Sequence, residues 1–463
     1  MMTRHSRPLR LLGYLTILTM GAAACGTGGG ASSASPVATS AAPVATGSSG
    51  ASAAPSSTSG DKTPIVVGDL AYFTGPFGPN GPQLAAEAEF PIKEVINLDP
   101  PLGRPITIIH EDIGTVGEGQ AAKKLLEQDG ADILLSPAHE YFTYRDYILN
   151  LVKEEDRPLM PSVHGGVIPG NIGGTAAEPL FRAQGLDEGV GVTDILYAQT
   201  LGAKSVAIIA TQTAGFQLIA DAAAKAAPLV GLTVLGRVDA PESATSYRAE
   251  VQKAAAWKAD ALLVLAPPAE SGTVVKNIAE AGLSTNVLLE SGSSEMEFYN
   301  TATAAAIATQ KAVLFPGFGH QDNAAWKFFQ PLWDNNPKYA AMNPATGFFA
   351  YTTYDLLIIT ALAIEKAGST KASAWAPAMY AVTSGANECY TYADCIAMIR
   401  SGKDIHYQGV TGPGTFSPSG VNAVTNAIFQ WDAKTGKYAQ IALVDPAKHL
   451  EILNQVAKKY VAP

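Results

Sequence analysis

The sequence predicts an α/β protein built from two doubly wound lobes that are joined by crossover segments. Short apolar segments alternate regularly with amphipathic, helix-like ones. The apolar segments are continuous rather than alternating, which is typical of parallel strands covered on both faces. After Phe181 and Arg182 the alternation restarts, so the chain contains two βαβ sets of similar size.

The first set begins at residue 65. We expect its strands at 65–70, 106–111, 131–135 and 159–163, and its helices at 83–96, 118–128 and 144–155. The second set is expected to have strands at 205–210, 232–238, 261–265 and 287–289, with 287–289 as its last, and helices at 189–201, 216–229, 247–257 and 274–281.

The remaining sequence does not form a third set. We expect a strand at 313–315, a long helix over 348–367, and a β-hairpin of 429–432 and 438–441 that turns at 434–437. Segments so far along the chain must pack on the earlier lobes. The chain is therefore expected to cross between the lobes more than once.

The N-terminus has the pattern of an export signal. Three arginines in the first ten residues precede an apolar run at 11–20 and then small residues up to Cys25. Such a segment is typical of a secretory signal and is too short to span a bilayer comfortably. Cys25 resembles the lipidated cysteine of the bacterial lipobox, although Ala22 stands where that motif usually has Leu. We expect a signal at 1–24 and lipidation of Cys25; a plain signal cleaved near Ala24 is the alternative.

A tether is expected to follow the signal. Residues 26–60 contain no charged and no aromatic side chain, so they cannot bury enough apolar surface to offset the entropy of ordering. A chain of about 35 such residues reaches on the order of 30 Å. We therefore predict that 25–62 form a lipidated N-terminus and a disordered tether; a spacer of no particular reach fits equally.

Composition limits the class of protein. No apolar run after the signal approaches the roughly 20 residues of a membrane helix. The formal net charge of -10 argues against a nucleic-acid partner. Besides Cys25 the chain contains only Cys389 and Cys395, and in an exported protein such a close pair predicts a disulfide. Two buried free thiols are the alternative, and a metal site is disfavoured because no further ligand lies at suitable spacing.

Several segments resemble, in order and spacing, the leucine-binding-protein-like family. They are residues 67–70 with 74–76, 103–105 with 111–112, 201–209, 354–355 with 363–368, and 389–395 with 402–405 and 412–416. The resemblance covers nearly all of residues 64–445. It implies the type I periplasmic binding protein fold, with two lobes that close on a small ligand. Such proteins deliver their ligand to a membrane permease powered by a cytoplasmic ATPase.

The resemblance sets the expected organisation. Residues 63–182 and 316–408 would form lobe 1, and residues 183–315 and 409–460 would form lobe 2. We expect a monomer without cofactor or metal, anchored by lipid on the extracytoplasmic face of the cell membrane.

Candidate ligand-binding residues lie where predicted strands end, since open α/β sheets bind ligands at the carboxyl ends of their strands. They are Phe77, Asn80, Ser136, Ala138, His139, Glu140, Tyr141, His164, Gly165, Thr213, Phe216, Glu290 and Ser291. Phe77 and Asn80 have an alternative role in packing on the sheet edge or facing solvent. Each histidine has an alternative role as a hydrogen-bonded structural residue.

The family's pattern for amino acids is incomplete in this chain. In the family, the turn after the third strand supplies hydroxyls and backbone N–H groups to an amino-acid carboxylate, which a helix N-terminus favours. A carboxylate after the last strand of the second lobe holds the ammonium group. Gly165 and Ala214 lack the polar groups that the family has at their positions. Glu290 would take the ammonium role one position displaced, or Ser291 would leave it vacant.

We therefore expect a small organic ligand other than a simple branched-chain amino acid. An aromatic or anionic molecule held partly by His139, His164, Tyr141 and Phe216 is the working hypothesis.

Catalysis is not expected. The chain has no Gly-x-Ser-x-Gly elbow, no Walker phosphate loop and no dinucleotide motif opening a helix after a strand. His139, Glu140 and His164 have side chains suited to a metal, but nothing in their spacing requires one. The predicted function is that of a solute receptor for an ABC importer. A ligand sensor that signals to a membrane partner without transport is the alternative, and an extracellular hydrolase would have to show turnover.

Overall fold

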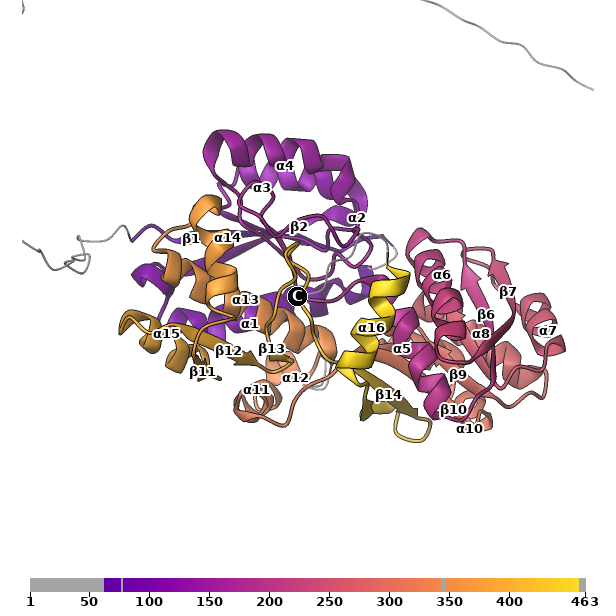
Figure 1. Cartoon of the computed structure of the whole chain (residues 1–463). Coiled ribbons are helices and arrows are strands. Elements are labelled where there is room, and N and C mark those ends of the chain that lie inside the picture. The colour runs from indigo at the N-terminus through magenta and orange to yellow at the C-terminus, as the bar shows by residue number, and fades with distance from the viewer. Residues whose placement is uncertain (1–61, 76–77, 343–346, 458–463) are drawn as a thin grey trace, which may run out of the picture. The chain divides into compact units, whose positions relative to one another are not determined.

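The computed structural model describes residues 62–75, 78–342 and 347–457 (Figure 1). The predicted signal at 1–24, Cys25, nearly all of the tether and Phe77 lie outside these residues. Within them the chain is an α/β fold with mainly parallel sheets, as predicted.

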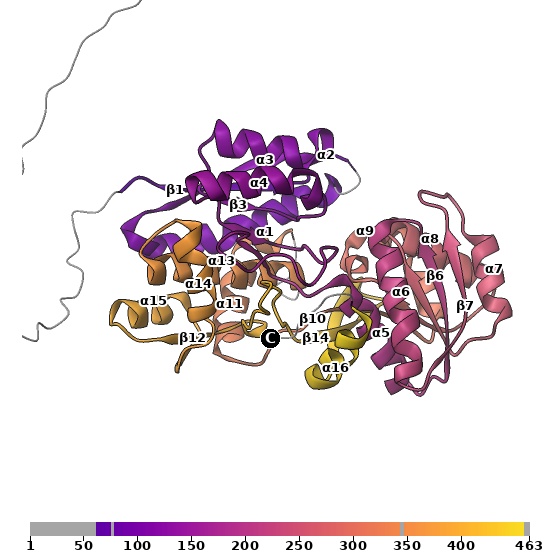
Figure 2. The same cartoon turned by 45° about the horizontal axis from the view of Figure 1, so that its top comes forward.

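The first sheet has the strand order β2-β1-β3, with all strands parallel. Two bridges, Ile133 to Leu159 and Ser136 to Ser162, connect β3 to the parallel pair β4-β5. Figure 2 shows α3 and α4 on one side of these strands and α1 on the other. The elements of this part are β1 (Ile65–Ala71), η1 (Gly78–Asn80), α1 (Gly81–Glu94), η2 (Ile96–Leu98), η3 (Pro101–Gly103), β2 (Ile106–Asp112), α2 (Ile113–Val116), α3 (Glu118–Glu127), β3 (Ile133–Leu135), α4 (Tyr141–Glu155), β4 (Met160–Ser162) and β5 (Leu180–Arg182).

The second sheet has seven strands in the order β15-β14-β10-β9-β8-β6-β7. Strands β6 to β10 are parallel, and the hairpin β14-β15 joins antiparallel beside β10. The bounds are α5 (Asp187–Thr200), β6 (Ser205–Thr211), α6 (Ala214–Leu229), β7 (Thr233–Ala240), α7 (Arg248–Ala256), β8 (Ala261–Leu265), α8 (Pro268–Glu280), β9 (Asn286–Leu289), η4 (Ser291–Ser294), α9 (Met296–Ala302), α10 (Ala304–Thr309), β10 (Ala312–Phe318), β14 (Asn426–Asp432), β15 (Lys437–Leu443) and α16 (Pro446–Val456).

The prediction that 287–289 is the last strand of the second set was wrong. β10 continues the same sheet parallel to β9. Its residues are almost all buried, and the short helices α9 and α10 form the crossover that precedes it. The predicted hairpin is confirmed and forms the edge of this sheet, while α16 packs on α5 and α6 (Figure 1).

The chain between β10 and β14 returns to the first sheet. Helix α13 packs against α1, α14 and α15. The elements are α11 (Ala324–Asp334), α12 (Pro337–Ala340), α13 (Phe348–Ala367), α14 (Ala372–Ala381), β11 (Asn387–Cys389), α15 (Tyr392–Arg400), β12 (Ile405–Gly409) and β13 (Gly412–Pro413). The predicted helix at 348–367 has the observed bounds.

The sequence led us to expect no apolar run as long as a membrane helix after the signal, but helix α13 does not meet this expectation. By length and composition its 20 residues would suffice to cross a bilayer. However, 89% of its most apolar window is buried inside the protein. A helix that is apolar all round and covered by other helices is the core helix of a globular unit.

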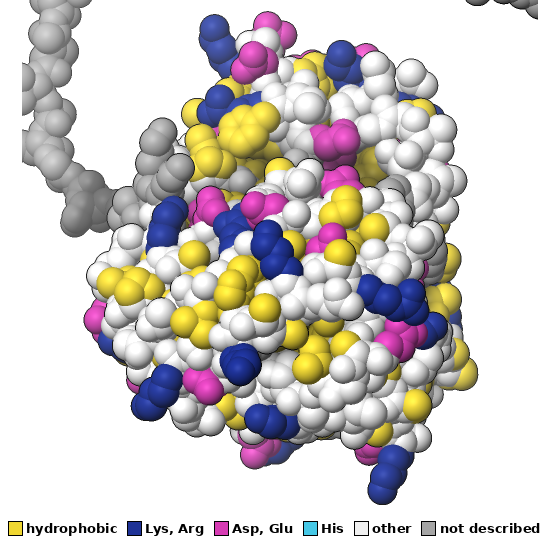
Figure 3. Space-filling model, turned by 90° about the vertical axis from the view of Figure 1, so that its right-hand side faces the viewer, with side chains coloured by type: hydrophobic (Ala, Val, Ile, Leu, Met, Phe, Trp, Pro, Cys, Tyr) yellow, Lys and Arg dark blue, Asp and Glu magenta, His cyan; other side chains and the backbone are white. Residues whose placement is uncertain are grey.

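Charges are mixed on the face of the molecule where α7 and β7 lie, at the right of Figure 1. Figure 3 shows Lys and Arg side chains on this face interspersed with Asp and Glu and with hydrophobic ones. This face therefore presents no continuous field of either sign.

Candidate functional site

Polar side chains from four elements form a continuous chain of contacts. Tyr72 follows β1, His139 follows β3, His164 follows β4, and Asp187 begins α5. The Tyr72 hydroxyl lies 2.8 Å from His139 Nδ1, and His139 Nε2 lies 3.0 Å from His164 Nδ1. His164 Nε2 is 3.7 Å from Asp187 Oδ1. The carboxyl ends of parallel strands meet at one edge, which is why residues so far apart in sequence lie together here.

The hydrogen-bond network assigns the protons along this chain of contacts. The backbone N–H of Gly166 donates to His164 Nδ1 at 3.3 Å, so this nitrogen is an acceptor and the ring proton is on Nε2, toward Asp187. His139 must then donate its Nε2 proton to His164. His139 Nδ1 consequently accepts from the Tyr72 hydroxyl.

Both histidines are held neutral. Solvent reaches the His139 ring, although protein atoms crowd around it. Desolvation, followed by repulsion from His164, lowers the pKa of His139 to about 3. Desolvation lowers the pKa of His164, whose side chain is 25% exposed, to about 4. Neither ring therefore carries a charge near neutral pH.

Buried carboxyl groups lie near Asp187, at the end of this chain of contacts. Glu290 follows β9, and its Oε2 accepts the backbone N–H of Gly292 at 2.7 Å. Its Oε1 has no hydrogen-bond partner within the described parts of the chain. Desolvation, and to a lesser extent repulsion by Asp187, raises the pKa of Glu290 to about 8. Burial likewise raises the pKa of Asp187 to about 7, against the attraction of Arg182.

Asp194 adds a third acid, two turns further along α5. It is fully buried, and neither carboxyl oxygen is hydrogen-bonded by any residue that the structure describes. Desolvation and then the charge of Glu290 raise its pKa well above the usual range.

Arg182, a buried base beside this group, binds backbone. Its Nη1 donates to the carbonyls of Gly165 at 3.3 Å and Ile168 at 2.7 Å. Its Nη2 donates to Pro169 at 3.2 Å and Ile172 at 2.6 Å. The guanidinium therefore fixes the loop after β4, with its terminal nitrogens engaged by the protein's own carbonyls.

The turn after β3 is closed by an internal carboxyl group. Glu118, at the start of α3, accepts with Oε1 the backbone N–H groups of His139 at 2.8 Å and Glu140 at 3.1 Å. Its Oε2 accepts the Tyr144 hydroxyl at 2.9 Å. In return Glu140 Oε2 accepts the backbone N–H of Glu118 at 3.1 Å. The carboxyl groups of Glu118 and Glu140 thus cap each other's helices.

Ser136 and its neighbours are similarly engaged. The Ser136 hydroxyl accepts the backbone N–H of Ala138 at 2.8 Å and lies 2.9 Å from the Tyr144 hydroxyl. Gly165 is buried with φ +74°, and a Cβ there would lie 3.0 Å from Arg182 Cδ, so glycine suits both the backbone and the space.

The remaining candidates do not join the chain of contacts. The Tyr141 hydroxyl donates to Glu178, which Arg145 also binds. Thr213 donates to Glu242. Asn80 precedes α1 without a side-chain capping bond, Phe216 packs on the core of the second sheet, and Ser291 opens η4.

Sequence reasoning missed four residues of the site: Tyr72, Glu118, Asp187 and Asp194. Tyr72 and Asp187 had a usable signal, because one directly follows the first strand and the other opens the first helix of the second set. The role of Glu118 depends on a contact across two helices and has no local signal. Within residues 62–75, 78–342 and 347–457, no group of three or more His, Cys, Asp or Glu is arranged to hold a metal ion.

Comparison with known proteins decides the family. Residues 64–437 match the family model described as periplasmic binding protein. The chain belongs to the periplasmic binding protein family. This family consists of substrate-binding proteins and implies a place outside the cytoplasm. No curated protein sequence matches the chain.

Solved structures of periplasmic binding proteins share the fold. A leucine-binding protein from Thermotoga maritima is 15% identical with a TM-score of 0.64, over 83% of this chain and 99% of that one. A substrate-binding protein of an ABC transporter from Sphaerobacter thermophilus is 19% identical with a TM-score of 0.65, over 82% and 97%. A solute-binding protein from R. palustris, in complex with benzoate, is 15% identical with a TM-score of 0.61, over 82% and 96%. At these identities the likeness shows the fold, which is the predicted type I periplasmic binding protein fold.

Proposed function

We propose that this periplasmic binding protein captures a small organic ligand between two lobes and delivers it to the permease of an ABC importer. The observation that carries the proposal is the chain of contacts from Tyr72 to Asp187. It joins the ends of β1 and β3 in the first sheet, and of the neighbouring strand β4, to α5, the first helix of the second set. Ligand sites of open α/β folds lie at such strand ends, and two lobes commonly close around them by hinge motion.

The division into lobes is part of this proposal. The predicted bounds, residues 63–182 with 316–408 for lobe 1 and residues 183–315 with 409–460 for lobe 2, cut through β10 and β12. We therefore propose the same division with β10 kept whole in lobe 2, and with β12 and its partner β13 kept in lobe 1. The crossovers are tied to one another by backbone hydrogen bonds: Arg182 N–H donates to the Gly420 carbonyl at 2.7 Å, and Gln321 N–H donates to the Val410 carbonyl at 2.8 Å. Bundled crossovers suit a hinge, because they bend together while each lobe stays rigid.

The membrane attachment is also proposed. Lipidation of Cys25 and a tether up to residue 62 would hold a monomeric receptor beside its permease on the extracytoplasmic face. Intact mass of the protein extracted from membranes should exceed that of the chain from Cys25 by the mass of the lipid. C25A should release the protein into the soluble fraction, and an unmodified mass would refute the anchor.

Ligand capture is tested by a thermal-shift screen of the purified protein against amino acids, amines, amides, aromatic acids and sugars. A ligand that binds only the folded state raises Tm by mass action. We expect at least one such compound, without turnover. A compound that is consumed would support the hydrolase instead. Uptake by vesicles carrying the permease then separates an importer from a sensor, which binds the ligand without transporting it.

A further inference from the structure

The donors that family resemblance assigns to a ligand carboxylate are engaged within the protein. The backbone N–H of Ala138 donates to Ser136, and those of His139 and Glu140 donate to Glu118. The acceptor side chains, Ser136 and Glu118, are 0% and 1% exposed. Glu118 thus occupies the place of an anionic ligand at this turn, and an incoming carboxylate would find no vacant donor among these three N–H groups.

A second position that favours anions is also filled. Helix α6 is 16 residues long, and the N-terminus of such a helix attracts negative charge. Asp187 Oδ2 lies 3.5 Å from the point where a Cβ on Gly215, in the first turn of α6, would stand. A Cβ on Gly166 would lie 1.9 Å from Asp187 Oδ1, so a glycine there leaves room for this carboxyl group.

Hydrogen-bond acceptors, by contrast, remain available. Glu290 is 5% exposed, and its Oε1 accepts no hydrogen bond from the described residues. It interacts electrostatically with Asp187 and Asp194, so the three acids share one region. Of the basic side chains, Arg182 acts on Asp187 but is engaged by four carbonyls. An unpartnered buried acid is costly, and a cationic ligand would relieve that cost.

We propose that the ligand is an organic amine or amidine that carries a positive charge and lacks a carboxylate, with Glu290 and Asp187 accepting its N–H groups. This inference rests on the proposed function and specifies the ligand class of the same site. It replaces the sequence-based hypothesis of an anionic ligand, because the histidines of that hypothesis are neutral and the anion positions are filled by the protein's own acids.

Binding of a cation should release protons. Glu290 is faced by Asp187, Asp194 and Glu295, and Asp187 by Arg182 and His164. In the unliganded protein, burial raises the pKa of Glu290 to about 8, and a bound cation would favour its ionised form. Amine affinity should therefore rise between pH 6 and pH 8, by up to about tenfold per pH unit for each proton released.

Matched probes test the inference. One set is isoamylamine, leucine and 4-methylpentanoate, which share an alkyl chain; the other is benzylamine, benzamide and benzoate. Each is added to the whole purified protein at pH 6 and pH 8, and Tm is measured. We expect an amine at a hundredfold excess over its Kd to raise Tm by roughly 2–4 °C, more at pH 8, with little effect of the carboxylates.

Two variants sharpen the test. E290Q should weaken binding of the amine at least tenfold and reduce its pH dependence to the part that Asp187 contributes, whereas E451Q, an exposed acid on α16, should change neither. A larger shift from 4-methylpentanoate or benzoate than from the amines would overturn the inference. The inference would also be overturned if none of the six probes shifted Tm. The proposed function itself would fail only if the thermal-shift screen of amino acids, amines, amides, aromatic acids and sugars also found no stabilising compound.

Discussion

His139 Nε2 lies 3.0 Å from Nδ1 of His164, and the two rings meet edge to face with centroids 4.7 Å apart. Only one proton fits between these nitrogens. Charging either ring would place a cation against its neighbour in a crowded, partly desolvated site. The pair therefore functions as a neutral relay of hydrogen bonds from Tyr72 toward Asp187, which fixes the orientation of both rings without adding charge.

The neutral pair predicts a loss of stability in acid. In the folded protein the pKa values of His139 and His164 fall to about 3 and 4, below the ordinary 6.5. Between pH 7 and pH 4 these two histidines bind protons in the unfolded chain but not in the folded one, so their contribution to the free energy of unfolding decreases as the pH falls. The raised pKa values of Glu118, Asp187 and Glu290 act in the opposite direction. On going from pH 7 to pH 4 in urea unfolding, the double variant H139N/H164N should therefore lose less stability, or gain more, than the wild type.

H406N, which changes a histidine on β12, serves as the control: its free energy of unfolding should depend on pH as that of the wild type does. If H139N/H164N and the wild type showed the same pH dependence of this free energy, the neutral assignment would be contradicted.

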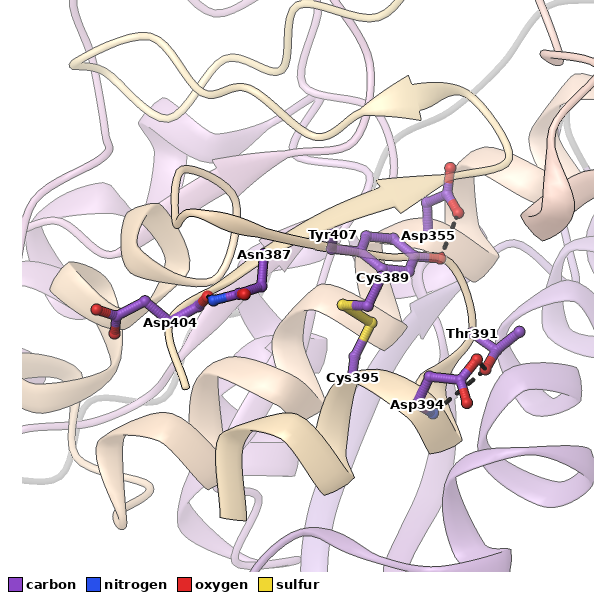
Figure 4. Close-up of a disulfide and its surroundings, with 8 residues drawn as sticks. All are labelled: Asp355, Asn387, Cys389, Thr391, Asp394, Cys395, Asp404 and Tyr407. Atoms are coloured by element: carbon purple, nitrogen blue, oxygen red, sulfur yellow. Dashed lines mark hydrogen bonds between the residues drawn. A yellow bond between two sulfur atoms is a disulfide. The ribbon is translucent and has the colours of Figure 1, made fainter. Parts of the chain in front are cut away.

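Asp355 on α13 is predicted to be a major stabilising residue. Its carboxylate accepts a hydrogen bond from the Tyr407 hydroxyl at 2.9 Å (Figure 4). It also accepts the Val410 N–H at 3.0 Å and both donors of Thr411 at 2.8 and 2.7 Å. D355A leaves these buried donors unsatisfied and should cost about 3 kcal/mol in the free energy of unfolding.

The matched control is D404N. Asp404 is 73% exposed and pairs with Lys366 at the surface, so D404N should lower the free energy of unfolding far less than D355A does. Urea unfolding of both variants compares the two acids directly. Equal costs would show that Asp355 does not hold the segment at 407–411.

The cysteine pair is predicted to be oxidised in the exported protein. Cys389 ends β11, Cys395 lies in α15, both side chains are buried, and they point toward each other (Figure 4). Alkylation of denatured C25A protein should label no thiol before reduction and two after it. In the C25A background, C389A/C395A should lower the free energy of unfolding by about 2 kcal/mol, the entropy of a loop this short. Labelling without reduction would favour the alternative of two free thiols.

Local patterns were sufficient for most of the fold. The apolar run at 348–367 gave the observed bounds of α13, and the hairpin at 429–441 was recognised by its turn. β10 was separated from the second set because α9 and α10 stand between it and β9, and sheet membership depends on pairing that no local pattern records. For the site, strand ends located His139, His164 and Glu290, but the electrostatic role of Asp187 and the capping by Glu118 depend on distant partners.

Variants of Glu118 provide the clearest test of whether the site prefers amines to carboxylates. Desolvation raises its pKa to about 7 in spite of three hydrogen bonds, so the fold tolerates a costly acid in order to bind the N–H groups of His139 and Glu140. E118A should lower the free energy of unfolding by about 2–3 kcal/mol, because it leaves buried donors unpaired. The vacated N–H groups would then attract 4-methylpentanoate or benzoate, for which the wild type has no donor there.

E118Q keeps an acceptor oxygen and should retain the wild-type preference. Calorimetric titration of the three proteins, with circular dichroism to verify folding, measures the change. A folded E118A that still binds isoamylamine and gains no affinity for carboxylates would show that this turn does not select against anions.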